Sequence, residues 1–306
     1  MAIGTAFSRE SIRFPNSGNI WVPRSSGRAA GAGLSMHSPC KALPVFAQRV
    51  LYVAVRVAGP RVLPGVRATW DDPVDADVWS AFLDDWHRLF GEWDSVSLYR
   101  RPQLGRSGCA LLLLRNGRGV GFVRITADNE RARNEFDVMS GVFSARPKTF
   151  TVAQPLGFGS GAGWSWLATA SVPNYPLGAV RRRAVRARVI DEIADILDGV
   201  IEKATPDLPD WRGAHNDLAP WNLRTDLGGR VIVIDWEDAA FAPRGSDRLY
   251  ADLTAHLTFR SSPPESTTVE AARWVAEILS SRRVAGETSD SINNRLLRAL
   301  SAVPLS

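Results

Sequence analysis

The hydrophobic pattern of the chain changes near its middle, and this change constrains the fold more than any other feature. Before residue 170, short apolar runs alternate with turn residues, as in Val96–Arg100, Ala110–Leu114 and Gly119–Thr126. The last two runs flank Asn116-Gly117, a pair that tolerates positive φ at both positions and so indicates a tight hairpin. After residue 180, apolar residues recur every three or four positions, which is typical of helices. The sequence therefore predicts the α+β class, with a β-rich N-lobe and a mainly helical C-lobe.

The remaining elements follow from the same two periodicities. In the first part, we expect helices at 75–91 and 128–143 and strands at 151–156 and 164–169. In the second part, we expect a strand at 231–234 and helices at 185–204, 247–258, 267–282 and 288–301.

Length and composition are those of a globular chain. The 306 residues, 45% of them apolar, allow one large domain or two modest ones. We divide the sequence into a basic extension over 1–70, a first lobe over 71–170 and a second lobe over 171–306. No run of 18 apolar residues occurs, so no transmembrane segment is expected. Two cysteines, Cys40 and Cys109, are too few for a disulfide framework, and we expect a cytoplasmic protein.

The positive charge of the chain is concentrated in the extension. Residues 1–70 carry nine cationic side chains against Glu10 alone, which leaves the rest of the chain slightly acidic. A basic nucleic-acid-binding domain is therefore disfavoured, and no nucleic-acid partner is expected. Residues 1–40 are rich in Gly, Ser, Ala and Arg and are predicted to be disordered, most clearly Arg24–Gly33. An alternative is that translation starts at Met36, which follows this stretch.

An apolar segment, Val45–Ala58, ends the extension. We expect it to form a short helix or strand that packs on the body of the protein. The alternative is weak contact with a membrane surface through 45–58, with Arg49 and Arg56 facing lipid headgroups.

The residues that carry chemistry lie in the second half. His215-Asn-Asp217-Leu-Ala-Pro-Trp-Asn222 is followed by the apolar run Val231-Ile-Val-Ile and then by Asp235. This order matches the catalytic loop of kinases, H-x-D-L-x-x-x-N, with an Asp after a buried strand where a magnesium ligand belongs. Taken singly, these residues also suit turns and a strand end. That explanation does not account for their joint order.

With these motifs, the sequence resembles the aminoglycoside phosphotransferase and choline kinase family over about residues 95–260. The resemblance implies a bilobal, protein-kinase-like fold and an ATP- and Mg²⁺-dependent small-molecule kinase. Asp217 would accept or orient the proton of the attacking hydroxyl, and Asn222 and Asp235 would bind Mg²⁺. His215 would brace the catalytic loop by hydrogen bonds. Asp252 would be either a buried acceptor for the loop amides or an exposed helix charge.

The resemblance also implies nucleotide contacts in the first lobe. Gly105, Ser107 and Gly108 would cradle phosphates, although a plain hairpin turn also favours glycine. Arg124 stands at the strand position where the family has lysine, and Glu135 on the next helix would pair with it. An arginine is larger than lysine and prefers bidentate contacts. The alternative function is therefore a nucleotide-binding pseudokinase or regulator with weak or no catalysis.

The hinge between the lobes is expected near Ala170 and Val172, whose backbone would bind the adenine edge. A plain strand leading into a loop is the other interpretation. A phosphatase or nuclease would also use clustered acids and Mg²⁺, but it would not need Arg124 and Glu135.

The acceptor is expected to be a neutral hydroxyl compound, such as a sugar, a polyol or a related metabolite. Residues 254–306 hold five acids and six arginines, a balance that argues against a polycationic antibiotic. Trp211, Trp221 and Trp236 flank the predicted site and would pack in the core or, alternatively, stack on a sugar or enclose a quaternary ammonium group.

Overall fold

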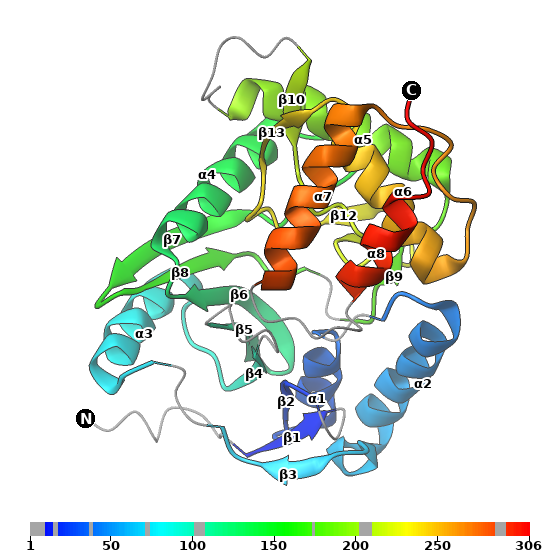
Figure 1. Cartoon of the computed structure of the whole chain (residues 1–306). Helices are drawn as coiled ribbons and strands as arrows, with labels where there is room; N and C mark the ends of the chain where they lie inside the picture. The colour runs from blue at the N-terminus through cyan, green and yellow to red at the C-terminus, as the bar shows by residue number, and fades with distance from the viewer. Residues whose placement is uncertain are drawn as a thin grey trace. The chain divides into compact units, whose positions relative to one another are not determined.

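The computed structural model describes residues 10–14, 18–36, 39–70, 74–100, 108–172, 175–201, 210–284 and 292–306. These residues form two compact units, coloured along the chain in Figure 1. The first unit comprises the described residues up to 136 and those of 153–177. The second comprises 137–152 and the described residues from 178 onward.

The first unit is built on an eight-stranded antiparallel sheet with the order β3-β1-β2-β4-β5-β6-β8-β7. Its strands are β1 (Ser11–Phe14), β2 (Ile20–Pro23), β3 (Val66–Ala68), β4 (Ser95–Arg100), β5 (Cys109–Arg115), β6 (Arg118–Thr126), β7 (Pro155–Gly161) and β8 (Trp164–Thr169). The predicted hairpin joins β5 to β6, and Asn116 and Gly117 have φ values of 52° and 69°. The prediction of a strand at 151–156 is wrong in its extent. Thr151 belongs to the second unit, where it exchanges backbone hydrogen bonds with Val231 and Val233. Strand β7 of the first unit begins only at Pro155.

Helices pack on both faces of this sheet. They are α1 (Gly27–Leu34), α2 (Ala42–Ala58), α3 (Ala76–Phe90) and the first half of α4 (Asn129–Ala145), with a short 3₁₀ turn at Pro60–Val62. Alternate side chains of a strand point to opposite faces. Accordingly, Leu111 and Leu113 of β5 join the cluster around α3, whereas Leu112 and Leu114 pack with alanines of α1.

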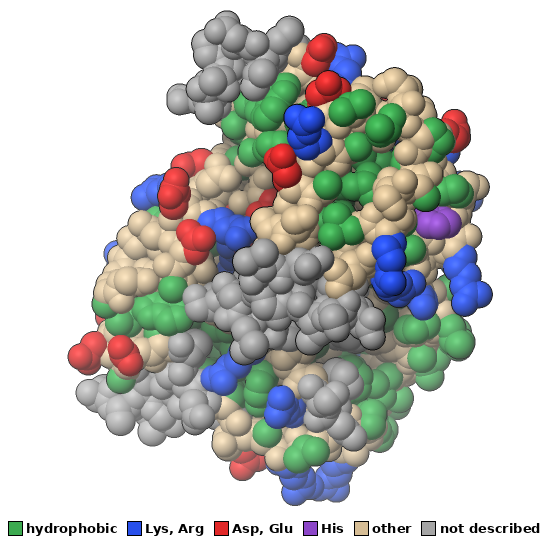
Figure 2. Space-filling view, in the orientation of Figure 1, with side chains coloured by type: hydrophobic (Ala, Val, Ile, Leu, Met, Phe, Trp, Pro, Cys, Tyr) green, Lys and Arg blue, Asp and Glu red, His purple; other side chains and the backbone are tan. Residues whose placement is uncertain are grey.

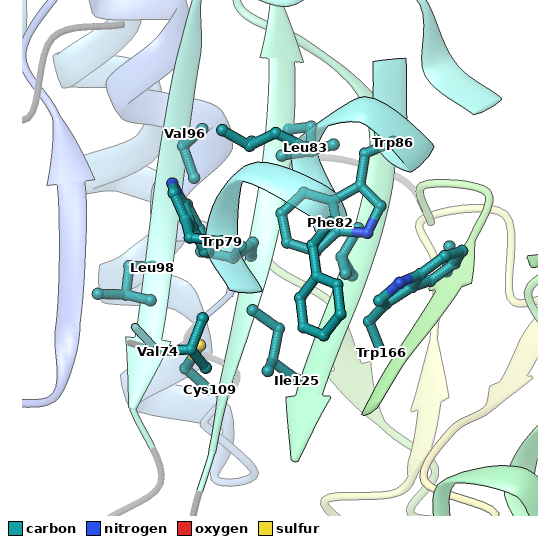
Figure 3. Close-up of a cluster of buried hydrophobic side chains, with 14 of the residues drawn as sticks. Val74, Trp79, Phe82, Leu83, Trp86, Val96, Leu98, Cys109, Ile125 and Trp166 are labelled. Carbon is teal, nitrogen blue, oxygen red and sulfur yellow. The ribbon is translucent and has the colours of Figure 1, made fainter. Parts of the chain in front are cut away.

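The core beneath α3 is aromatic. Trp79 and Trp86 meet edge to face at 5.4 Å, and Trp86 meets Trp166 of β8 in the same way at 6.4 Å (Figure 3). Edge-to-face contacts place the positive ring edge against the negative ring face, which stabilises the pair beyond simple burial. This helix was predicted at 75–91 and is confirmed.

The prediction of disorder over residues 1–40 is wrong for the described part of that segment. Strand β2 pairs with β4, Ile20 and Val22 are buried, and Arg24–Gly33 contains most of helix α1. Gly and Ala are abundant there because α1 lies very close to the sheet. A Cβ on Gly33 would come within 2.9 Å of Ser97 Oγ and 3.1 Å of Val22 Cγ1. Small residues therefore allow burial by close backbone approach, which a composition argument overlooks.

The second unit is mainly helical. Its helices are α5 (Arg183–Val200), α6 (Ser246–Phe259), α7 (Val269–Val284) and α8 (Ile292–Leu300), together with the second half of α4. Its short strands are β9 (Gly178–Ala179), β10 (Trp211–Ala214), β11 (Leu223–Thr225), β12 (Val231–Val233) and β13 (Ala240–Pro243). The predicted class, β-rich in the first part and helical in the second, is confirmed. None of the described helices has the length and apolar character needed to cross a bilayer.

Candidate active site

The loop over residues 215–222 joins β10 to β11, and Asp235 follows the end of β12. Because β11 and β12 pair in antiparallel register, with Leu223 opposite Val233, the residue before β11 lies beside the residue after β12. Accordingly, the Ile234 N–H donates to the Asn222 carbonyl at 3.1 Å. The fold therefore brings the loop that carries Asp217 next to Asp235, as the sequence predicted.

His215 is fully buried and braces this loop. Its Nδ1 accepts from the Asp217 N–H at 3.3 Å, so its Nε2 carries the proton and donates to the Ile234 carbonyl at 3.2 Å. Its ring packs against Trp236 with 4.6 Å between centroids. Burial lowers the pKa of His215, so the ring is neutral at neutral pH. Both ring nitrogens are occupied by the backbone, which fits a bracing role.

The loop amides are held by Asp247, near the start of α6. Its two carboxylate oxygens accept from the His215 N–H at 2.7 Å and from the Asn216 N–H at 2.8 Å. The sequence suggested Asp252 either for this role or as an exposed helix charge, and both alternatives are wrong. Asp252 is buried, but it pairs with Arg186 at 3.0 Å and Arg183 at 3.1 Å on α5.

Asp217 and Asn222 are locked together. The Asn222 amide nitrogen donates to Asp217 Oδ2 and to the Asp217 carbonyl, both at 2.9 Å. These bonds fix the amide orientation and direct Asn222 Oδ1 away from Asp217. Both side chains are buried, so the carboxylate is oriented by protein groups.

The other oxygen of Asp217 is bound by a residue that sequence analysis missed. Arg282, on α7, donates from Nη1 to Asp217 Oδ1 at 2.9 Å and to the Tyr250 hydroxyl at 2.6 Å. Its Nη2 donates to Asp238 Oδ2 at 2.8 Å. The guanidinium thus bridges two carboxylates of the site. Asp238 could have been suspected from the sequence, because it lies three residues after Asp235 in an acid-rich run. Nothing near Arg282 in the sequence points to its contact with Asp217.

These surroundings set the charge of Asp217. Burial raises its pKa to about 6, opposed by the Arg282 guanidinium and reinforced by the negative charges of Asp235 and Asp238. A carboxylate with a pKa near neutrality is ionised at pH 7 and still basic enough to accept a proton in a general-base step. For Arg282, burial is the largest single influence and opposes the charge, but Asp217, Tyr250 and Asp238 together outweigh it and raise the pKa.

The donor set fits a magnesium ion. Asn222 Oδ1 is a neutral oxygen, and Asp235 offers a carboxylate at a backbone position with φ of 67°. Mg²⁺ is commonly bound by one or two carboxylates together with substrate phosphates. In the described parts of the chain, no group of three His, Cys, Asp or Glu side chains forms a metal site.

In the first unit, Arg124 of β6 and Glu135 of α4 are brought together as predicted. Arg124 Nη1 lies 2.7 Å from Glu135 Oε2, and both side chains are at least nine-tenths buried. A buried pair of this kind fixes the direction of the guanidinium.

The structure describes three of the other predicted nucleotide contacts, and each of them has a local role in the backbone. Gly108, just before β5, has φ of +130°, and a Cβ there would lie 2.1 Å from the Ile125 carbonyl oxygen. Its glycine is therefore explained by strand packing. The Ala170 N–H donates to the Gln154 carbonyl at 2.8 Å, and the Val172 carbonyl accepts from Ser171 Oγ at 3.0 Å. Gly105 and Ser107 lie outside the described residues.

The tryptophans near the site are mostly core residues. Trp236 is fully buried between Phe150 and His215. Trp221 packs on the helical core cluster. Trp211 is half-buried and meets Trp274 edge to face at 5.1 Å. Core packing thus accounts for Trp221 and Trp236.

Comparison with known proteins supports the resemblance. Residues 166–283 match the model of the phosphotransferase enzyme family, and this range contains the loop, Asp235 and Arg282. The resemblance predicted from the sequence is therefore confirmed over this range. A search of curated proteins found no match.

Three solved structures illustrate the likeness. Choline kinase LicA from Streptococcus pneumoniae is 13% identical with a TM-score of 0.49, covering 73% of this chain and 99% of its own. Amicoumacin kinase hAmiN is 12% identical with a TM-score of 0.43, covering 72% of this chain and 82% of its own. Spectinomycin phosphotransferase APH(9)-Ia is 9% identical with a TM-score of 0.45, covering 75% and 94%. Because these identities and TM-scores are low, the resemblance to phosphotransferases depends on the family match over 166–283 and on the residues of the site.

Proposed function

We propose that this protein is an ATP- and Mg²⁺-dependent phosphotransferase that moves the γ-phosphoryl group to a hydroxyl of a small molecule. The observation that carries the proposal is the buried Asp217–Asn222 pair beside Asp235, held on a loop whose amides are bound by Asp247. Phosphoryl transfer needs positioned oxygens and little covalent help from the protein. The family match over 166–283 supports the same class of reaction.

In this proposal, Asp217 accepts the proton of the acceptor hydroxyl as its oxygen forms a bond to phosphorus and the bond to ADP breaks. A magnesium ion held by Asn222 and Asp235 would neutralise charge on the phosphates. Arg124, directed by Glu135, would contact the nucleotide phosphates in place of the usual lysine. The neighbourhood of Ala170 and Val172 stays a proposed hinge contact, now with the Ala170 N–H already engaged.

The acceptor that we propose is neutral: a sugar, a polyol or a related metabolite. Arg282 supports this choice because it places a positive charge on the Asp217 carboxylate itself. This guanidinium neutralises part of the negative charge that would attract a polycationic acceptor to Asp217. We also propose the cytoplasm as the location of the protein, because ATP is available there.

A second function, a nucleotide-binding regulator with weak catalysis, is favoured by the same arginines. Arg124 replaces the expected lysine, and Arg282 and Asn222 each bind one oxygen of Asp217. The two functions differ in turnover, which makes them separable by experiment.

The first experiment measures thermal unfolding of the full chain with and without Mg·ATP or Mg·GTP. Nucleotide at about 100 times its dissociation constant should stabilise the native state by about 2.7 kcal/mol. The shift should require magnesium and shrink in Asp235→Ala, but not in Glu277→Gln, an exposed carboxylate on α7. The absence of any shift with either nucleotide would contradict both functions.

The second experiment follows transfer from γ-labelled ATP to panels of neutral sugars and polyols, aminoglycosides and choline. Label should enter a neutral hydroxyl compound with the wild type and with Glu277→Gln, and not with Asp217→Asn. A magnesium-dependent nucleotide shift without transfer to any acceptor or to water would favour the regulator.

A further inference from the structure

Helix α2 carries an apolar stripe that no described residue covers. Leu43, Phe46, Val50, Val53 and Val57 recur every three or four positions, so they lie along one face of the helix. Their exposed fractions run from 53% for Val50 to 84% for Val57. Hydrophobic side chains gather over this helix in Figure 2. A contiguous exposed patch of this kind marks an interaction site more often than single exposed apolar residues do.

The opposite face of α2 is anchored to the first unit. Val55 is fully buried in a cluster with Leu34 of α1 and Leu63, and Val45 is buried as well. Gln48 donates from Nε2 to the Leu34 carbonyl at 2.8 Å. The helix is therefore held in place by one face, and the apolar stripe is not needed for that packing.

The charges around the stripe are all of one sign. Residues 11–70 contain eight Arg and Lys side chains and no Asp or Glu. With about 3.6 residues per turn, Arg49 and Arg56 lie along one border of the stripe. Arg56 donates to the Tyr52 hydroxyl at 3.0 Å, and its guanidinium lies 5.3 Å from the Tyr52 ring centre. Past the end of the helix, Arg61 is exposed next to Val62.

We propose that α2 binds the surface of an anionic lipid bilayer, lying in the plane of the interface with the stripe inserted between headgroups. A basic amphipathic helix binds such surfaces through buried apolar area and attraction to anionic lipids. A second copy of the chain fits less well, since the pairing of two such faces would bring cations together with no acid in residues 11–70 to neutralise them. The inference stands independently of the proposed function.

The test is co-sedimentation of the full chain with vesicles of phosphatidylcholine alone or mixed with phosphatidylglycerol. We expect binding to the anionic vesicles that weakens as salt rises, and little binding to phosphatidylcholine alone. Phe46→Asp should lower the partition coefficient at least about tenfold, because a large apolar side chain leaves the interface and a negative charge enters it. The double variant Arg56→Gln/Arg61→Gln should flatten the salt dependence.

The matched control is Leu227→Asp, an apolar side chain exposed by 71% in the second unit. It should bind as the wild type does, and thermal unfolding should show that every variant is folded. The proposal is overturned if the wild type stays in the supernatant with anionic vesicles at low salt. It is also overturned if Phe46→Asp and Leu227→Asp bind equally, or if sedimentation velocity reveals a dimer that Phe46→Asp dissociates while vesicles bind no protein.

Discussion

Arg282 and Asp217 form a part-buried ion pair, with 2.9 Å between Nη1 and Oδ1, in which a helix of the second unit supplies the counter-ion of the loop carboxylate. Asp217 is surrounded by groups that would otherwise oppose its charge. Asp235 and Asp238 are negative, and burial removes water. The arginine therefore keeps the carboxylate ionised in a site that would favour its protonated form.

Replacing Arg282 with glutamine should raise the pKa of Asp217 above its value of about 6. If Asp217 is the base, the acid limb of the rate profile should move to higher pH, since the ionised fraction is lost earlier as pH falls. The measurement is the pH dependence of phosphoryl transfer or of ATP turnover. Arg273→Gln, an exposed arginine on the same helix, is the control. An acid limb that stays in place would contradict this role of Arg282.

The titration of Asp217 should also appear in stability. Its pKa is raised from 3.8 to about 6 in the folded state, so the folded protein binds this proton more tightly than the unfolded chain. The resulting stabilisation is fully present below pH 3.8, is lost as pH rises through 6, and amounts to about 3 kcal/mol at most. Asp217→Asn does not titrate. Its melting temperature relative to the wild type should therefore be higher at pH 7.5 than at pH 4. Parallel stability curves for the two proteins would contradict the raised pKa.

Replacing His215 with alanine should destabilise the fold without moving the acid limb. The change leaves the Asp217 N–H and the Ile234 carbonyl without their ring partners and opens a cavity beside Trp236. We expect a loss of about 2–4 kcal/mol in the free energy of unfolding. Chemical denaturation gives the loss, and the rate profile of the folded variant gives the role. An acid limb that disappears in the variant would identify His215 as the base.

Replacing Asp247 and replacing Asp252, both on α6, should have different effects on turnover. Asp247→Asn removes one of the two oxygens that bind the loop amides and should impair both nucleotide turnover and stability. Asp252→Asn weakens the pairs with Arg186 and Arg183 on α5, away from the loop, and should reduce stability while the folded fraction keeps its turnover. Turnover per folded molecule distinguishes the two. Equal loss in both variants would contradict the assignment of Asp247 as the loop anchor.

The residues of the candidate site could be predicted where they lie close together in the sequence. His215, Asp217 and Asn222 lie on one loop, and Asp235 ends a strand that pairs beside it, so order along the chain already implies proximity. The prediction failed for Arg282 because that contact depends on how α7 packs beside the loop, which no local pattern records. The sequence pointed to Asp252 as the residue that binds the loop amides, but Asp247 does so. Both aspartates lie on α6, and which of them faces the loop depends on how that helix packs.

The fold was predicted well where apolar periodicity was strong, as in α3 and β4 to β6. It was missed over residues 11–14 and 18–34, where Gly and Ala allow burial by close approach, as Gly33 against Ser97 illustrates. Hydrophobicity scales count large apolar side chains and give little weight to small ones. A helix that approaches a sheet closely is therefore mistaken for a disordered segment.

The Arg124–Glu135 pair gives the sharpest test of the first unit. Removing one partner of a buried ion pair leaves an uncompensated charge, so Arg124→Met and Glu135→Gln should each cost about 3–5 kcal/mol of stability. The double variant buries neither charge and should cost clearly less than the sum, with a coupling energy of about 0.5–3 kcal/mol. Denaturant titrations of the four proteins measure this cycle. Additive losses would mean that the 2.7 Å contact contributes nothing to folding.

The variant Arg124→Lys tests the charge separately from the shape of the side chain, because a lysine restores a charge for Glu135 on a more compact head group. It should recover part of the stability and retain Mg·ATP binding, whereas Arg124→Met should lose the thermal shift with nucleotide.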